Sequence, residues 1–418
     1  MKENKRKIAA VSLFLVLVIS VNLIGCSMPI MAEDLMKDVK PSAVSTLDDL
    51  SHGNVAATDF GVKLFKALHR QGNNTLISPL SIISALAMTA NGASGQTLAQ
   101  MESALGMSLE ELNSYLYTYV SSLPQGEKYK LSIANSIWFK DDDRLTVNRS
   151  FLQKNADYFG AELYKAPFDS QTLSDINNWV KKETDGMIPK VVDDIPNEAV
   201  MYLINALAFD AEWMSTYEKR QVRDGEFTKE NGTKQQVEMM YASEHKYLED
   251  ASATGFIKYY KGGEYAFAAL LPKEGISLSE YVSSLDGAAL ASMLSDAQNT
   301  EVKTAIPKFE TEFEVELSEV LKNIGMTDAF NVKTADFSAL GSYEDGNINI
   351  DAVIHKTYIQ VGEKGTRAGA VTAVEMNGGA APNPEEPKVV YLDRPFVYML
   401  IDCENNLPFF IGSVTEIE

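Results

Sequence analysis

Hydrophobic residues follow a helical spacing in the first part of the chain. Val55, Phe60, Leu64 and Leu68 recur every four or five positions, which predicts an amphipathic helix over residues 54–70. Residues 74–97 read as a short strand, a Ser-Pro break and an apolar helix that ends at an Asn-Gly pair. The same reasoning predicts further helices over 97–106, 176–192 and 313–326.

Strand patterns prevail in the rest of the chain. Residues 130–139 alternate between apolar and polar side chains, and residues 199–213 are almost wholly apolar, as in a strand that is buried on both faces. No Pro-, Gly- or Ser-rich linker separates the two kinds of element, so the pattern indicates one mixed domain of helices and strands from about residue 50 to 418. Further strands are expected within 227–241, 255–260, 265–273, 349–362, 394–403 and 407–414.

The first 25 residues read as an export signal. A basic start precedes an apolar run, and residues 23–26 (Leu-Ile-Gly-Cys) resemble the lipobox of bacterial lipoproteins. That resemblance implies cleavage before Cys26, a lipid on its thiol, and an exported protein anchored to the cell envelope or cell surface. The alternative is an uncleaved membrane span, since the apolar run approaches the needed length. Residues 26–53 are polar and aperiodic, so we expect a tether there and the folded domain over 54–418.

Composition and charge narrow the function only slightly. The chain has 418 residues, 45% of them hydrophobic, and a formal charge of −21. An acidic chain repels nucleic-acid phosphates, so we expect no nucleic-acid partner. The only cysteines are Cys26 and Cys403, so lipidation of the first leaves no disulfide. Cys403 follows an apolar run and is interpreted as a small buried group at a strand end.

No pattern of enzyme chemistry is found. The four histidines lack metal-ligand spacing, there is no Gly-x-Ser-x-Gly elbow, and residues 362–366 lack the order of a phosphate loop. His355 lies in an alternating strand, where a hydrogen-bonded core histidine is favoured over a catalytic base. We therefore expect no enzyme, no catalytic residues, no cofactor and no metal.

Residues 363–387 form an unusual segment between two predicted strands. If 366–374 became a strand, one face would carry only the small side chains of Thr366, Ala368, Ala370 and Thr372, whereas Arg367 would lie on the other. Such a strand could enter a sheet without overpacking its core, and Gly365 ahead of it would serve as a hinge. The pattern alone leaves an exposed loop with accidental alternation equally open.

Residues 363–374 resemble the hinge of a serpin reactive-centre loop. The resemblance extends through most of 54–418, and it rests on several short motifs that occur in the family's order. These are Asn74–Ser81, Ile204–Ala206 with Phe209 and Trp213, Ile306–Phe309, Gly325–Met326, Ala335–Ser338, His355–Lys356 and Pro395–Phe396.

The resemblance implies a single α+β domain with a large central mixed sheet, about nine helices and an exposed reactive loop over about 363–390. It further implies a monomer that inhibits a serine protease, with a cysteine protease as the alternative target. The protease cleaves the loop and is trapped as an acyl-enzyme when the loop inserts as an extra strand. The resemblance assigns a hinge to Glu363, Gly365, Thr366, Ala368, Ala370 and Thr372, and shutter and breach positions to Ser78, Ser81, Asn205, Trp213 and His355.

The family register places the cleaved bond at Gly379–Ala380, with Met376 as an alternative. No Lys, Arg or aromatic residue lies between Arg367 and Lys388, which favours an elastase-like or subtilisin-like target. Arg367 and Gly369 depart from the family's usual residues, but both belong to the outward face. Two rival hypotheses remain, a non-inhibitory serpin that binds or stores a ligand and a solute-binding lipoprotein.

Overall fold

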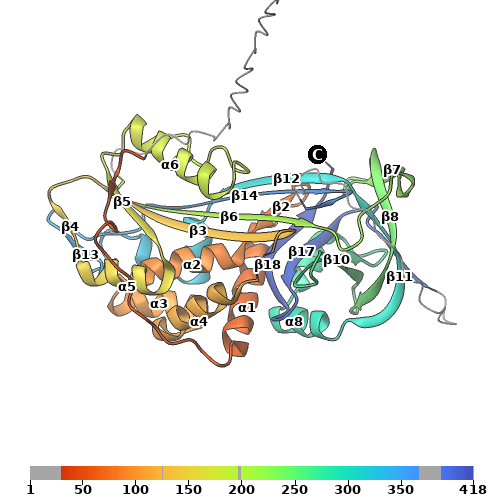
Figure 1. The fold of residues 1–418 in the computed structure, drawn as a ribbon, viewed down its shortest axis with the longest axis horizontal. Helices are drawn as coiled ribbons and strands as arrows, with labels where there is room; N and C mark the ends of the chain where they lie inside the picture. The colour runs from red at the N-terminus through yellow and green to blue at the C-terminus, as the bar shows by residue number, and fades with distance from the viewer. Residues whose placement is uncertain (1–29, 125, 196–198, 367–386, 418) are drawn as a thin grey trace, which may run out of the picture.

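The computed structural model describes residues 30–124, 126–195, 199–366 and 387–417. In this part of the chain, two large β-sheets are packed with nine α-helices (Figure 1). The predicted α+β fold with a large central mixed sheet and about nine helices is therefore confirmed. The helices are α1 Ser51–Leu68, α2 Pro79–Ala90, α3 Gly95–Leu105, α4 Leu109–Ser122, α5 Arg149–Phe159, α6 Ser170–Glu183, α7 Leu278–Ser284, α8 Gly287–Ser295 and α9 Ser318–Ile324.

The first sheet has seven strands in the order β1-β5-β3-β6-β15-β14-β12. Parallel and antiparallel pairs both occur in it. Two of the strands, β1 and β15, have only two residues each, so five longer strands make up most of the sheet. The bounds are β1 Glu33–Asp34, β5 Glu162–Ala166, β3 Tyr129–Lys140, β6 Met201–Glu212, β15 Gly365–Thr366, β14 Ala352–Gly362 and β12 Phe309–Glu316.

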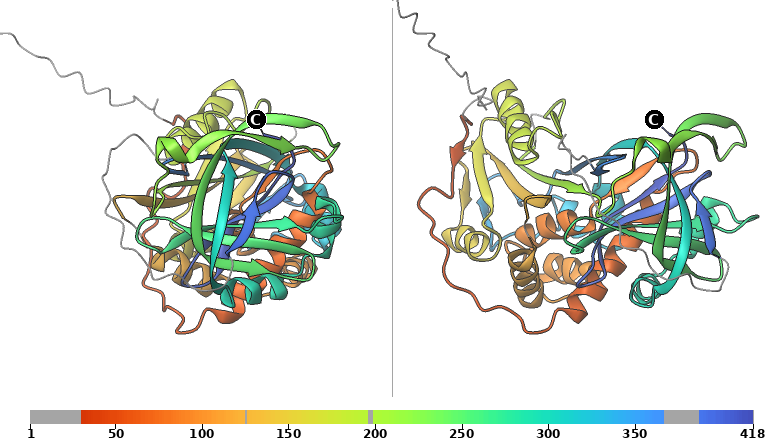
Figure 2. Two further views of the ribbon diagram at one scale, coloured as in Figure 1. Left: turned by 90° about the vertical axis from the view of Figure 1, so that its right-hand side faces the viewer. Right: turned by 45° about the vertical axis from the view of Figure 1, so that its right-hand side comes forward.

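The second sheet has nine strands and curls at the other side of the molecule (Figures 1 and 2), and its buried side chains belong to the same hydrophobic core as those of α1 and α2. Its order is β16-β11-β8-β9-β10-β17-β18-β2, with β7 paired to β8. A separate pair joins β13 to β4. The bounds are β16 Lys388–Tyr391, β11 Gln298–Pro307, β8 Lys234–Glu249, β9 Ala253–Tyr259, β10 Tyr265–Pro272, β17 Phe396–Asp402, β18 Leu407–Val414, β2 Thr75–Ile77, β7 Val222–Thr228, β13 Gly341–Tyr343 and β4 Leu145–Val147.

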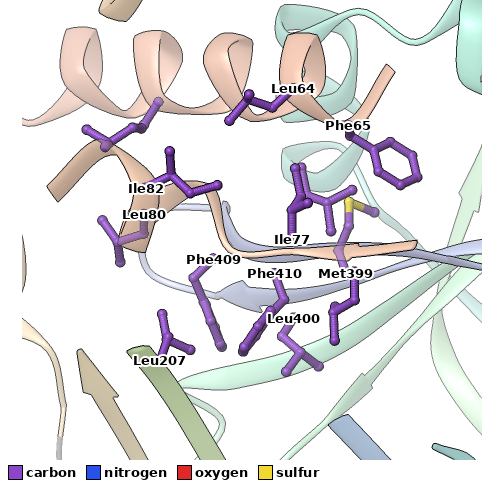
Figure 3. Packing of buried hydrophobic residues seen from close by; sticks show 14 of the residues in the cluster. Leu64, Phe65, Ile77, Leu80, Ile82, Leu207, Met399, Leu400, Phe409 and Phe410 are labelled. Atoms are coloured by element: carbon purple, nitrogen blue, oxygen red, sulfur yellow. The ribbon is translucent and has the colours of Figure 1, made fainter. Parts of the chain in front are cut away.

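Helix α2 is the centre of the main hydrophobic core. The Ser78 side chain caps its first turn, Pro79 follows at the first helical position, and every residue of the helix is buried. It packs between the seven-stranded sheet, α1 and strand β18, where Leu80 and Ile82 lie near Phe409 and Leu207 (Figure 3). A smaller core, which includes Trp138, lies under α6 on the opposite face of the seven-stranded sheet.

Two predicted elements are corrected by the structure. Residues 313–316 belong to strand β12 rather than to the predicted helix 313–326, and the helix α9 begins only at Ser318. The alternation of apolar and acidic residues in β12 matches its pairing with β14, because the glutamates point to solvent. The helix predicted over 176–192 is α6, which starts at Ser170 with an Asp169 capping box and ends at Glu183.

The described part of the predicted tether is also corrected. Residues 30–50 lie against the folded body rather than free of it, and α1 begins at Ser51. The backbone N–H groups of Met31 and Ala32 donate to the buried carboxylate of Asp175, and β1 adds to the edge of β5. Residues 1–29, with the predicted signal and Cys26, lie outside the described residues.

Candidate functional site

Strands β6 and β14 form an incomplete pair in the middle of the seven-stranded sheet. At one end they pair directly, with Tyr202–Asn205 beside Ala352–His355. At the other end the two residues of β15 lie between them. Between these ends, residues 206–210 and 356–360 face one another with no intervening strand among the described residues. The sheet therefore contains a gap that a further strand could fill.

Strand β15 occupies the mouth of this gap. Gly365 pairs with Glu212 and Gly362, and Thr366 pairs with Ala211 and Val361. A Cβ atom at position 365 would lie 1.9 Å from the carbonyl oxygen of Ala211, so only glycine allows this approach. Thr366 is buried, and its hydroxyl is hydrogen-bonded to the hydroxyl of Tyr260. The two residues thus fix the register in which the chain enters the gap.

The turn from Gly362 to Gly365 reverses the chain between β14 and β15, and backbone contacts hold it in place. The backbone N–H of Trp213 donates to the carbonyl oxygen of Lys364 (2.7 Å), and its indole N–H donates to that of Gly362 (2.8 Å). The backbone N–H of Tyr217 donates to the carbonyl oxygen of Glu363 (2.9 Å). The breach, defined here as Trp213, Tyr217, Tyr260 and residues 362–366, is therefore an ordered site.

Side chains add to the breach from both sheets. The Glu363 carboxylate lies 2.9 Å from the Lys308 ammonium, which keeps the pKa of Glu363 below its ordinary value although burial opposes the shift. The Trp213 ring stacks on Tyr260 with 4.4 Å between ring centroids. A cavity of about 950 Å³ borders the turn and includes Lys308, Glu363 and Gly365 in its lining. The turn is therefore reachable from outside the sheet.

A second group of polar residues, the shutter, lies where β6 and β14 begin to separate. The Nε2 atom of His355 accepts from the backbone N–H of Ser78 (3.1 Å), so its Nδ1–H donates to the Oδ1 atom of Asn205 (2.7 Å). Complete burial lowers the pKa of His355 to about 3, and the ring is neutral at ordinary pH.

Two further polar atoms of the shutter have no hydrogen-bond partner among the described residues. These are the amide nitrogen of Asn205 and the hydroxyl of Ser81, although the backbone N–H of Ser81 donates to the Ser78 hydroxyl (3.3 Å). An unpaired buried polar atom costs free energy, and this cost is removed when a hydrogen-bond partner reaches the atom. The shutter is thus less completely hydrogen-bonded than an ordinary core.

The structure brings together the described members of the predicted site in these two groups. Trp213 joins Glu363, Gly365 and Thr366 in the breach, whereas His355 joins the other shutter residues. The remaining predicted residues of the hinge and of the cleaved bond lie outside the described residues. They are Ala368, Ala370, Thr372, Met376, Gly379 and Ala380, together with the two departures Arg367 and Gly369.

Sequence reasoning missed several breach residues. Tyr260 and Tyr217 come from strands or loops far from residue 363 in the sequence, and no local pattern marks them, whereas Lys308 lies in the motif Ile306–Phe309 but was given no role. One indirect signal existed, because a buried indole N–H such as that of Trp213 needs an acceptor. A buried Trp213 therefore predicts that an acceptor lies close to its indole, and the structure shows this acceptor to be the carbonyl oxygen of Gly362.

The part of the chain that the structure describes gives no sign of a metal site, a membrane-spanning helix or a reactive thiol. No cluster of three or more His, Cys, Asp or Glu residues there could hold a metal ion. No described helix has the length and apolar character needed to cross a bilayer. Burial raises the pKa of the Cys403 thiol to about 12, so it is not a reactive thiolate.

Comparison with solved structures places this arrangement among known folds. The native state of the thermophilic serpin tengpin is 48% identical and superimposes with a TM-score of 0.88, covering 92% of this chain and all of that one. The latent state of tengpin is 46% identical, covers 90% of this chain and all of that one, and has a lower TM-score of 0.78. The chain is therefore more similar to the native arrangement.

Sequence comparison agrees with the structural one. An uncharacterized serpin-like protein of Thermococcus kodakarensis is 30% identical over 366 residues, which cover 86% of this chain and 84% of that protein. The leukocyte elastase inhibitor of Equus caballus is also 30% identical, over 86% of this chain and 98% of its own. Residues 55–417 match the family described as Serpin (serine protease inhibitor). The chain belongs to the serpin family.

Proposed function

We propose that this protein inhibits a serine protease by offering residues 363–390 as a substrate and trapping the enzyme during turnover. The observation that carries the proposal is the gap between β6 and β14, with β15 already paired to both strands at its mouth. A loop that continues from Thr366 could therefore enter the sheet as a strand between β6 and β14. Inhibition rather than catalysis is the family's general activity.

The register of β15 defines the neighbours of an added strand. If the same pairing continued, Ala368 would lie between Phe209 and Ile359, and Ala370 between Leu207 and Thr357. These neighbours are buried, so small residues suit the inward face and bulky ones would overpack it.

The same register would bring Thr372 to the shutter. It would lie between Asn205 and His355, where its hydroxyl could serve the unpaired amide nitrogen of Asn205. Insertion this far would separate Asn205 from His355, so their mutual hydrogen bond would be exchanged for bonds to the incoming strand, and the amide nitrogen of Asn205 would gain an acceptor.

Trapping is a competition between two fates of one covalent intermediate. The protease serine attacks the carbonyl carbon of Gly379, an ester forms, and Ala380 leaves as a new amino terminus. Water would normally hydrolyse the ester. The 14 residues from Thr366 to Gly379 would span about 45 Å as a strand, so insertion would carry the protease across the domain and distort its active site.

The target is proposed from the residues of the loop. Met376 and the small residues up to Ala380 suit an elastase-like or subtilisin-like protease, since no Lys, Arg or aromatic residue lies between 367 and 388. The test is incubation with a panel of such enzymes, followed by denaturing gels and intact-mass measurement. We expect an SDS-stable complex whose mass identifies the cleaved bond. Cleavage of the loop by all of them without any stable complex would refute inhibition by trapping.

We further propose that Cys26 carries a lipid anchor. The support is the lipobox-like sequence of residues 23–26 after an apolar run. Strand β1 begins seven residues after Cys26 and pairs through β5 and β3 to the Met201 end of β6, whereas Thr366 pairs with Ala211. These ends lie roughly 30 Å apart along the strand. An anchored protein would thus hold its loop away from the membrane. A Cys26→Ala variant should be released from the envelope fraction, and its retention there would contradict the proposal.

A further inference from the structure

A buried lysine lies directly behind the breach. Lys258, on β9, has a side chain that is only 2% exposed, and its Nζ atom lies 2.7 Å from a carboxylate oxygen of Glu244. The same ammonium donates to the carbonyl oxygen of Ser215 (3.2 Å). Lysine is rarely buried so completely, because an ammonium loses its hydration and needs compensating partners. Its position therefore requires a reason.

The aromatic contacts of Lys258 supply that reason. Its Nζ atom lies 4.6 Å from the centroid of the Tyr217 ring and 5.4 Å from that of Trp213. Both are within the range in which a cation is attracted to a ring face, and the attraction is stronger away from water. Trp213 is also stacked on Tyr260, so its indole is held by one aromatic ring and one cation.

The two residues whose rings Lys258 contacts are also the ones that hold the loop's turn. Trp213 donates to the carbonyl oxygens of Lys364 and Gly362, and Tyr217 donates to that of Glu363. Among the described residues, no hydrogen bond or ion pair joins the side chain of Lys258 to residues 362–366. Its influence on the loop therefore passes through these two aromatic residues.

We propose that Lys258 is a positioning residue for strand addition. By fixing Trp213 and Tyr217, it keeps the Gly362–Gly365 turn in the geometry from which the following residues enter the gap. Glu244 neutralises the buried charge. This inference rests on the proposed inhibitory function and names a residue that sets its efficiency. A looser turn would slow insertion, so more acyl-enzyme would be hydrolysed and more inhibitor consumed for each protease trapped.

The test compares a Lys258→Met variant with a double variant, Lys258→Met with Glu244→Gln. Methionine keeps the length of the side chain without its charge, and the double variant leaves no unpaired buried carboxylate that could prevent folding. The control is Lys234→Met, because Lys234 lies the same 2.7 Å from Glu226 on the same sheet but is well exposed. A Lys258→Arg variant restores the charge.

Two quantities are measured. The first is the number of inhibitor molecules consumed per protease trapped, which should rise roughly fivefold in both Lys258→Met variants while the rate of loop cleavage is unchanged. This consumption of inhibitor should stay near the wild-type value in Lys234→Met and should return partly toward that value in Lys258→Arg. The second is hydrogen exchange at the amides of Trp213 and Tyr217, which should become faster in the same variants even without protease.

The outcomes separate this inference from the proposed function. If the wild type traps no protease, the proposed function fails, whereas unaltered exchange at Trp213 and Tyr217 refutes the positioning role of Lys258 in any case. Wild-type consumption in the double variant would show that Lys258 and Glu244 form a merely structural pair, and the inference would be wrong.

Discussion

The two large sheets differ in how they are held together. In the nine-stranded sheet, β10, β17 and β18 are buried at every residue, and each is paired on both sides. Aromatic rings such as those of Phe267 and Tyr398 stack between its strands. In the seven-stranded sheet, β6 and β14 separate halfway, and buried amide, imidazole and hydroxyl groups lie where they part.

This difference shows how one domain can hold a permanent part and an exchangeable part. Apolar packing depends on the fit of many contacts at once, so a close-packed sheet has one good arrangement. A polar position can exchange one hydrogen-bond partner for another at little cost, provided that no partner is left unpaired. The gap and its shutter thus have the composition expected of a sheet that accepts another strand. Four predictions test this contrast, in order of decreasing effect.

The largest effect is expected at the mouth of the gap. A Thr366→Arg variant should form no SDS-stable protease complex and should behave as a plain substrate, because residue 366 is buried between Ala211 and Val361. Gln360→Arg on the exposed face of β14 is the control and should still trap. Gel analysis of the products measures both. A Thr366→Arg variant that traps protease would show that the loop does not enter by this route.

The nine-stranded sheet should respond to the loss of packing in a different way. Leu400 on β17 is fully buried (Figure 3), and Leu400→Ala should lower the free energy of unfolding by about 3 kcal/mol. The loss should be similar in the intact and the loop-cleaved protein, because β17 does not border the gap. Urea unfolding of both forms measures it. A loss confined to one form would mean that the two sheets are not independent.

The shutter should make stability depend on pH. The folded protein keeps His355 neutral down to a pKa of about 3, whereas the unfolded chain binds a proton near the ordinary value of about 6.5. The unfolded state therefore binds more protons between these values, and stability falls as pH decreases, by up to about 1.4 kcal/mol per pH unit.

Urea unfolding at pH 7, 6 and 5 tests this contribution. Wild type should lose about 2 kcal/mol from His355 alone between pH 7 and 5, and His355→Gln should lose correspondingly less. Equal pH dependence in the two proteins would contradict a neutral, buried His355.

The smallest effect is expected at the edge of the breach. Lys308 and Glu363 are 30% and 40% exposed, so solvent screens their ion pair. Lys308→Gln should lower stability by about 0.5 kcal/mol, and high salt should largely remove the difference. Thermal melts in low and high salt measure this effect. A salt-independent loss would indicate that Lys308 acts through packing instead.

Local sequence patterns predicted much of the fold. The buried run of β6, the helix α2 after its Ser-Pro break and the strands β17 and β18 follow from spacing and turn residues. The prediction was wrong where a strand is followed closely by a helix, because the last residues of β12 were assigned to the start of α9. The contacts of residues 30–50 with the folded body are made to distant elements, so no local pattern could indicate them.

The site was predictable only in part. Small residues from Thr366 onward suggested a strand with one narrow face, and the resemblance supplied the shutter and breach positions. The partners of these residues were not predictable, because Tyr260, Lys258 and Lys308 reach the breach through tertiary packing. A buried lysine between two rings leaves no mark on the periodicity of β9, most of whose residues are buried.

The central claim is that the gap between β6 and β14 receives the loop. The most direct test is to cleave the loop at residues 376–381 with a protease and compare the melting temperatures of the intact and the cleaved protein. Insertion would add a strand with roughly one hydrogen bond per residue to each side, so the cleaved protein should melt at least about 10 °C higher. An unchanged or lower melting temperature after cleavage would contradict the claim.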